Sequence, residues 1–377
     1  MQPSSTSVKL PRMVALKVVA FIVGAVAVYL TFGSAVRTVI LPRAVPSRLT
    51  RIVFLRMRTV FMLRVGPRAT YERRDRVMAL YGPVSLLATL VVWVAFVMAG
   101  FTAMFWGLGG RSVRTSFVLS GSSVLTLGFE KPTDLASTVL AFAEAGTGLV
   151  LLAMLITYLP SIYSAFSRRE AAVTALEVRA GSPPSAAEMI ERFWVLGRID
   201  KLNEVWVRWE EFFVDIEESH TSFPALVFFR SPQPDHSWVT AGGAVLDTAS
   251  IVASTVAIPR DVQAEFCIRS GYLALRRIAD FFGIPYEAAP QRGDPISIAR
   301  SEFDEVCDRL AAAGVPLKED RDRSWLDFAG WRVNYDTVLL ALAGLTMAPY
   351  APWSSDRGIR TVTPRRFRAR PFGPPRA

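Results

Sequence analysis

Residues 117–132 hold the groups best suited to chemistry in this chain. Within them, Thr126, Leu127, Gly128 and Phe129 can form an extended turn that presents successive backbone carbonyls. Such carbonyls replace the hydration shell of a cation where side chains point away and the turn is supported from behind. Thr126 can add a hydroxyl ligand, Gly128 permits unusual dihedrals, and Phe129 can wedge against a neighbouring helix. The stretch is therefore a candidate for cation coordination.

Serine hydroxyls lie just before this turn, at Ser120, Ser122 and Ser123. Hydroxyls of this kind can bond to backbone groups that an irregular turn leaves without partners, which matters most where water is absent. We therefore predict that Ser122 and Ser123 support the turn from the preceding helix.

Three apolar segments can hold this turn in a membrane. Residues 83–106 precede it without a charged residue, and residues 133–166 follow it with only two acids. Residues 13–32 form a third segment, interrupted by one lysine. At about 1.5 Å per residue, twenty residues cover the roughly 30 Å hydrocarbon core. We predict three membrane-spanning helices, with residues 117–132 as a re-entrant pore loop between the second and the third.

The first apolar segment has a rival interpretation. A basic start, an apolar run and the small residues Gly33, Ser34 and Ala35 are also the ingredients of a cleaved signal peptide. We favour a retained span.

The segment between the first two spans, residues 37–80, carries eleven arginines against two acids. Basic residues beside spans resist translocation, so this linker is expected in the cytoplasm. Apolar residues alternate with arginines from Leu49 to Leu63. This pattern predicts an interfacial helix that lies on anionic lipids of the inner leaflet.

The composition argues against nucleic-acid binding and against an enzyme. The net charge is +10, but the N-terminal excess surrounds apolar spans, and no basic groove with interleaved aromatics is evident. Cys267 and Cys307 lack metal-ligand spacing and are expected to be buried cytoplasmic thiols, and only His220 and His236 could serve histidine chemistry. No nucleotide loop, catalytic triad or metal motif is present.

The order span, short helix, extended turn, span is that of a minimal cation pore. Thr126-Leu127-Gly128-Phe129 resembles the Thr-Val-Gly-Tyr part of the potassium-channel signature, with Ser123 and Leu125 in the places of the preceding threonines. The resemblance covers roughly residues 80–168 and is to the two-span pore domain of prokaryotic channels. It implies that four chains build one pore, that the carbonyls of residues 126–129 line a potassium filter, and that no other cofactor is needed. The C-terminal part resembles that of an actinobacterial channel family whose cytoplasmic part has no assigned role.

The sequence departs from this signature directly after Phe129. The family continues with a second glycine and usually an aspartate, whereas Glu130 and Lys131 stand here. A residue other than glycine adopts that backbone at a cost of about 1 kcal/mol or more. The outermost ion site is therefore expected to be missing or reshaped, and four Glu130 side chains could ring the pore mouth and concentrate monovalent cations.

Four residues of the third span have two interpretations each. Glu144 is either a cation-attracting or proton-sensitive group facing the cavity, or it makes a structural bond to one of the hydroxyls nearby (Ser122, Ser123, Thr126). Gly146 and Gly148 are either an inner-helix hinge, as the resemblance implies, or close-packing residues. Pro160 either kinks the helix at a gate or ends it.

The remainder of the chain has a helical pattern. Ser185 and Glu188 predict a capping box that opens a helix over residues 185–218, broken near Gly197. Further helices are expected over residues 243–256, 261–282 and 301–313, and residues 337–350 read as a buried core helix.

Together these features predict an all-α membrane protein with three transmembrane helices, a re-entrant pore loop and a cytoplasmic all-α domain. The expected segments are 1–36 (tail and first span), 37–80 (basic linker), 81–168 (pore domain), 169–353 (helical domain) and 354–377 (disordered tail). The leading hypothesis is a homotetrameric cation channel of the plasma (inner) membrane, gated or modulated by its cytoplasmic domain. The alternative is a membrane-anchored scaffold or sensor that does not conduct.

Overall fold

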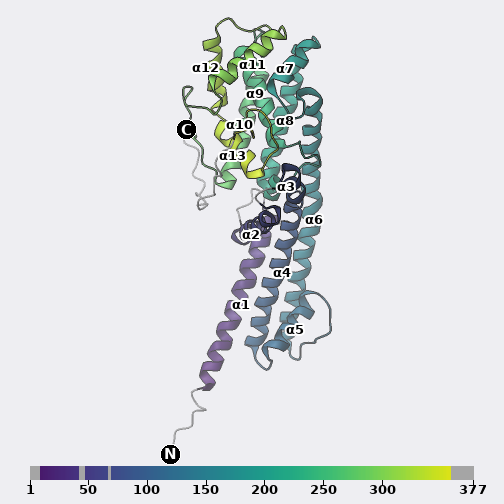
Figure 1. The fold of residues 1–377 in the computed structure, drawn as a ribbon. Coiled ribbons are helices and arrows are strands. Elements are labelled where there is room, and N and C mark those ends of the chain that lie inside the picture. Colours follow the sequence, from purple (N-terminus) through teal and green to yellow (C-terminus); the bar gives the residue numbers. More distant parts are fainter. Residues whose placement is uncertain (1–8, 42–46, 67–68, 358–377) are drawn as a thin grey trace, which may run out of the picture. The chain divides into compact units, whose positions relative to one another are not determined.

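The computed structural model describes residues 9–41, 47–66 and 69–357, and this part of the chain is helical, as predicted. Its β-type pairing is limited, over the described ranges, to an isolated bridge between Val256 and Leu317. The helices are α1 (Lys9–Val39), α2 (Arg48–Val65), α3 (Tyr71–Met78), α4 (Tyr81–Leu108), α5 (Val113–Val124), α6 (Leu135–Ala180), α7 (Ala186–Val195), η1 (Ile199–Lys201), α8 (Leu202–Ser222), η2 (Pro224–Phe228), α9 (Trp238–Thr255), α10 (Val262–Phe282), α11 (Arg300–Ala312), α12 (Arg321–Arg332) and α13 (Asp336–Thr346) (Figure 1). The expected disordered tail, residues 354–377, falls mostly outside the described residues.

The chain divides into two compact units. The first unit comprises Met1–Pro67 and Leu80–Ile162, and the second comprises Arg68–Ala79 and Tyr163–Ala377. The first predicted span, α2 and most of the predicted pore segment thus belong to one unit. The linker segment that contains α3 belongs to the other unit, with the C-terminal helices.

Three helical segments are long and apolar enough to cross a membrane: Arg12–Val39, Tyr71–Leu108 and Leu135–Ala180. They contain the first two predicted spans and all of the third except its first two residues, and they are compatible with a multi-pass membrane protein. The third is longer than predicted, because α6 continues through Pro160 to Ala180. Pro160 therefore does not end the helix, which corrects one of its two interpretations.

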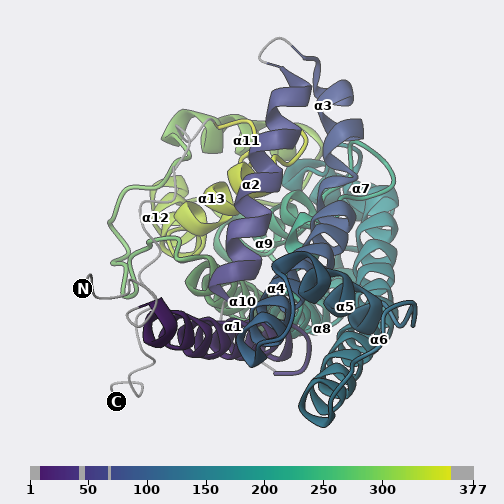
Figure 2. The ribbon, with the colours of Figure 1, turned by 90° about the horizontal axis from the view of Figure 1, so that it is seen from below.

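Small residues bring α1 and α4 close together in the first unit. A Cβ atom on Gly24 would lie 2.4 Å from the carbonyl oxygen of Gly100, and one on Gly107 would lie 2.7 Å from that of Lys17. Without side chains at these positions the two backbones approach closely, as in many membrane helix pairs. Seen from below, α5 lies between α4 and α6 (Figure 2). The buried side chains of Trp93, Phe105, Leu119 and Leu151 belong to the core of this unit, so α5 is held by packing on both sides.

The predicted linker helix is present as α2. Ser47 caps it by accepting a hydrogen bond from the backbone N–H of Thr50. The hydroxyls of Thr38 and Thr50 lie 2.9 Å apart, and the Tyr81 hydroxyl donates to the carbonyl of Phe54 at 3.0 Å. These bonds fix α2 against α1 and α4. The arginines between residues 48 and 64 are therefore carried by an ordered helix.

The second unit is built around α9, in which every residue except Ala253 is buried. The prediction of a helix over residues 243–256 placed its start too late. Ser237 caps the helix at Trp238, and a small-residue run hides the periodicity there. The predicted break at Gly197 is confirmed, and this glycine adopts a positive φ of 63°. The predicted ends of α10 are also confirmed: Asp261 caps its start, and Gly283 follows its end with a φ of 64°.

One local prediction in this unit fails, and one helix was not predicted. The Ser185 side chain makes no capping hydrogen bond, and its N–H donates to the Ala180 carbonyl at 2.8 Å while Glu188 pairs with Arg192, so the predicted capping box does not form. Helix α12, capped by Asp320, was not predicted because its charged residues mask the apolar face. The two cysteines are buried free thiols, as expected.

Candidate cation-coordinating turn

Helix α5 leads directly into the candidate turn. Ser112 caps its start by accepting a hydrogen bond from the backbone N–H of Thr115 at 3.1 Å. Its 12 residues cover about 18 Å at 1.5 Å per residue, too little to span a bilayer. The helix ends at Val124, and the chain then turns through Leu125 to Glu130.

Ser122 accepts hydrogen bonds from three backbone N–H groups of this turn. Its carbonyl oxygen accepts from the N–H of Leu127 at 2.8 Å and from that of Gly128 at 3.4 Å. Its hydroxyl accepts from the N–H of Glu130 at 3.2 Å. Ser122 is 1% exposed. The turn is thus held from behind by a buried residue of α5. The Ser123 hydroxyl instead donates to the carbonyl of Leu119 within the helix.

These bonds fix the direction of the carbonyls. Across a planar trans peptide, the carbonyl of one residue points opposite to the N–H of the next. The N–H groups that reach Ser122 therefore turn the carbonyls of Thr126, Leu127 and Phe129 away from it. No donor within the described residues bonds to the carbonyl oxygens of residues 126–129. One face of the turn consequently presents free carbonyl oxygens.

Positive φ angles recur at every second residue of the turn, at Thr126 (55°) and Gly128 (73°). For a β-branched residue such as Thr126 this conformation costs about 1–3 kcal/mol. The Thr126 hydroxyl donates to the carbonyl of Leu125 at 2.8 Å. Glu130 does not continue the alternation, since it is not among the described residues with positive φ. Glu130 therefore does not pay the energetic cost of a positive φ, a conformation that glycine adopts readily.

The apolar side chains of the turn are exposed in a single chain. Leu125, Leu127 and Phe129 are 53%, 57% and 65% exposed. Phe129 therefore makes no wedge against its own helix. Three large apolar side chains exposed together form a surface that favours contact with lipid or another protein.

Glu144 of α6 bonds to the helix before the turn. Its Oε1 atom lies 2.5 Å from the Ser120 hydroxyl, which is also 2.9 Å from the carbonyl oxygen of Met98. Glu144 is fully buried, so in one chain it does not face a cavity. Its partner is Ser120 and not one of the three hydroxyls expected. Hydropathy placed the acid in the span but could not identify the facing serine.

Proton counting constrains this contact. Ser120 carries one O–H and cannot donate to both Met98 and Glu144. A proton on Glu144 satisfies both contacts, because the carboxyl then donates to Ser120 while Ser120 donates to Met98. The Glu144 Oε2 atom has no hydrogen-bond partner among the described residues. The geometry therefore fits a neutral carboxyl that joins α4, α5 and α6.

Gly148 fixes how closely α6 approaches the end of α5. A Cβ atom there would lie 2.5 Å from the carbonyl oxygen of Val124, whereas one on Gly146 would meet nothing within 4 Å. Gly148 therefore has the close-packing role. Gly146 is free of that constraint.

Arg111 ties the two loops that flank α5, a role not predicted from the sequence. It donates to the hydroxyls of Ser137 at 2.6 Å and Thr133 at 2.7 Å and lies 3.5 Å from the carboxylate of Asp134. Asp134 in turn caps α6 by accepting from the Ser137 N–H at 2.9 Å. The spacing of Asp134 and Ser137 is a capping signal that could have revealed this connection.

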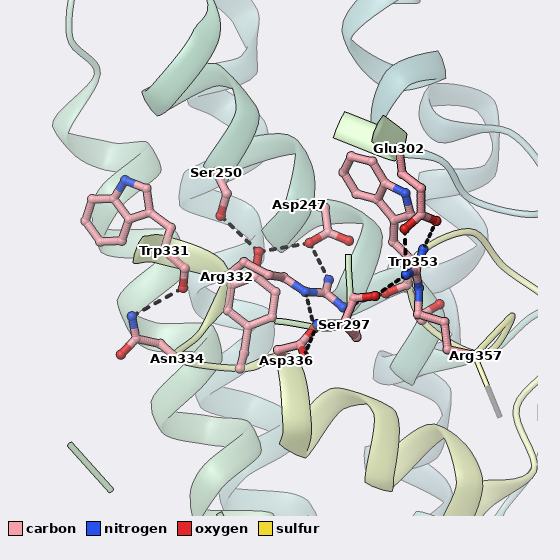
Figure 3. Close-up of polar contacts among 12 residues, drawn as sticks. Asp247, Ser250, Ser297, Glu302, Trp331, Arg332, Asn334, Asp336, Trp353 and Arg357 are labelled. Atoms are coloured by element: carbon pink, nitrogen blue, oxygen red, sulfur yellow. Dashed lines mark hydrogen bonds and ion pairs between the residues drawn. The ribbon is translucent and has the colours of Figure 1, made fainter. Parts of the chain in front are cut away.

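A buried ionic cluster in the second unit is the other polar constellation (Figure 3). Arg332, fully buried, pairs with Asp247 at 2.6 Å and Asp336 at 2.7 Å and donates to the carbonyl of Trp353 at 2.6 Å. The Tyr335 hydroxyl donates to Asp247 at 2.9 Å. Each guanidinium nitrogen has a partner, and the cluster joins α9, α12, α13 and the end of the described chain.

Within the described residues, no group of His, Cys, Asp and Glu side chains is arranged to hold a metal ion. Neither family models, curated proteins nor solved structures give a match to this chain.

Proposed function

We propose that this chain is a subunit of a passive cation pore in which the turn of residues 126–129 coordinates the permeating ion, potassium or another monovalent cation. The observation that carries the proposal is the set of carbonyls of Thr126, Leu127 and Phe129, which point away from Ser122 and accept no hydrogen bond from the described residues. Carbonyl oxygens in this state are available to replace water around a cation.

Two further features support coordination of a cation. The turn follows the C-terminal end of α5, where aligned peptide dipoles favour positive charge. The strain at Thr126 also favours a functional explanation, because a strained backbone persists where it is used and is held by its surroundings.

A single chain offers carbonyls from one side only, and a dehydrated cation needs them all round. We propose four copies around one axis, with the exposed side chains of Leu125, Leu127 and Phe129 covered by neighbouring subunits. Glu130 would then ring the pore mouth, at the place where the second signature glycine is missing.

In this proposal α4 and α6 cross the plasma (inner) membrane and α5 re-enters it from outside. The arginines of α2 contact anionic lipids, and the C-terminal unit is cytoplasmic and biases the gate. Since α6 runs unbroken from the apolar segment to Ala180, a change in the C-terminal unit can reach the pore through one helix.

The test is a flux measurement on purified protein in liposomes with a potassium gradient, together with chemical crosslinking. We expect cation flux and crosslinked species up to the tetramer. Absence of flux with a monomer or dimer would contradict the proposal and favour the alternative, a membrane-anchored scaffold or sensor built on the second unit. That alternative draws support from the large buried core of the second unit, which has 42 buried members among the described residues and needs no pore.

A further inference from the structure

A cleft of about 860 Å³ opens within the second unit, lined by the last turns of α6, the end of α7 and the start of α8. These elements lie near one another in Figure 1. The volume falls within the range of about 300–1,000 Å³ that is usual for small-molecule sites. The turn of residues 126–129 lies in the other unit, so the cleft is a separate feature.

The cleft has an apolar floor and an apolar rim. Leu176 and Trp209 on the floor are 1% and 3% exposed. On the rim, Val178, Val195 and Leu196 are 73%, 75% and 73% exposed. Large apolar side chains that gather around a hollow and remain exposed mark a surface that binds an apolar group.

The charged residues of the cleft are mainly basic. Its acids are already paired: both Glu191 oxygens accept from Arg309, at 2.6 and 2.5 Å, and Glu204 pairs with Lys201 at 2.7 Å. The basic lining residues are Arg179, Arg192, Arg198, Lys201 and Arg208. The cleft therefore has an excess of positive charge that its own acids do not neutralise.

Two of these guanidinium groups are available to a ligand. Arg192 pairs with Glu188 and donates to the carbonyls of Glu177 and Val178, and Arg179 donates to the carbonyl of Ala175 at 2.7 Å. Arg198 and Arg208 are exposed, and neither side chain bonds to an acceptor within the described chain. A guanidinium group binds carboxylate, phosphate or sulfonate in a bidentate manner.

We infer that this cleft binds an amphipathic anion, with the acidic head on Arg198 and Arg208 and the apolar body over Trp209 and the rim residues. A free carboxylate with an acyl chain and an anionic lipid of the bilayer share this chemistry. The inference does not depend on ion conduction, because it concerns only binding within the second unit.

The test uses the full chain in phosphatidylcholine nanodiscs, photolabelled with a medium-chain fatty acid that carries a diazirine and mapped by mass spectrometry. We expect labels on residues 172–209 that laurate suppresses and dodecanol does not. Phosphatidylglycerol in the nanodisc suppresses the label if the natural source is a lipid, and leaves it unchanged if the source is a free anion. Either result fits the inference once the label maps to the cleft.

The double variant Arg198→Gln, Arg208→Gln should weaken labelling by about tenfold or more, since it removes two charge-assisted bonds. The matched control is Arg269→Gln, which removes an exposed arginine of α10 outside the cleft. Circular dichroism checks that the variants keep their helical content. Labelling outside the cleft, equal competition by dodecanol, or equal labelling of the folded double variant would each overturn the inference.

Discussion

Arg230 forms an ion pair with Asp75, and this contact holds α3, the short helix that precedes α4, against the C-terminal helices of its unit. The same guanidinium donates to the Tyr71 hydroxyl at 2.9 Å and to the carbonyls of Thr346 and Met347 at 2.8 and 3.0 Å. One side chain thus joins the segment before the second span to the end of α13. The α3 segment of the linker is therefore part of the C-terminal unit rather than a free connection.

Replacing Asp75 by Asn should loosen α3. The pair is largely buried, with side chains 11% and 12% exposed, so its loss should cost about 2 kcal/mol of local stability. Hydrogen exchange of residues 71–78 measures this directly. Glu72→Gln is the control, because it removes an exposed acid of the same helix. Equal exchange in the two variants would show that the ion pair does not hold α3.

At Glu144, Gln and Ala should behave differently. Glutamine keeps a donor for Ser120, so Glu144→Gln should stay within about 1 kcal/mol of the wild type, whereas Glu144→Ala leaves Ser120 facing a cavity and should lose about 2–3 kcal/mol. Thermal unfolding in detergent provides the measurement. If Gln is as damaging as Ala, the carboxyl acts as a charge and the neutral assignment is wrong.

The two glycines of α6 should respond oppositely to alanine. Gly148→Ala forces a methyl group against the Val124 carbonyl and should destabilise the chain by about 1–3 kcal/mol. Gly146→Ala enters open space and should be neutral or stabilise by up to about 1 kcal/mol through helix propensity. The free energies of unfolding of the two variants decide this. A destabilised Gly146→Ala would point to a role that the single chain does not reveal.

The second unit should lose stability in mild acid because of His220. Burial, followed by the charge of Arg169, lowers the pKa of His220 well below its ordinary value. Below a pH of about 6.5, His220 is protonated in the unfolded chain but stays neutral in the folded chain. The free energy of unfolding therefore decreases as the pH is lowered, by at most about 1.4 kcal/mol per pH unit. His220→Gln should flatten this slope between pH 6.5 and 5 in chemical unfolding. An unchanged slope would assign the acid sensitivity to other groups.

Local signals in the sequence predicted much of the fold. Mean hydropathy marks the three apolar helices because a span is long and continuous. Asp261 and Gly283 mark the ends of α10 because a capping side chain and a left-handed glycine act within one turn. These signals need no knowledge of neighbouring helices.

Side-chain partners could not be predicted in the same way. The contact of Glu144 with Ser120, and that of Arg332 with Asp247, depend on how helices far apart in the chain rotate and pack. The turn itself was recognisable from Thr126 and Gly128. The role of the Ser122 carbonyl was not, because backbone acceptors leave no mark in a sequence.

The most direct test of the pore compares potassium flux into liposomes for Gly128→Ala and Gly110→Ala. Both glycines have positive φ (73° and 77°) and open surroundings, so alanine imposes a similar backbone strain at each. Only Gly128 lies in the carbonyl turn. We expect Gly128→Ala to abolish flux and Gly110→Ala to retain it, with equal amounts of folded protein in both. Undiminished flux in Gly128→Ala would contradict the assignment of this turn as the ion pathway.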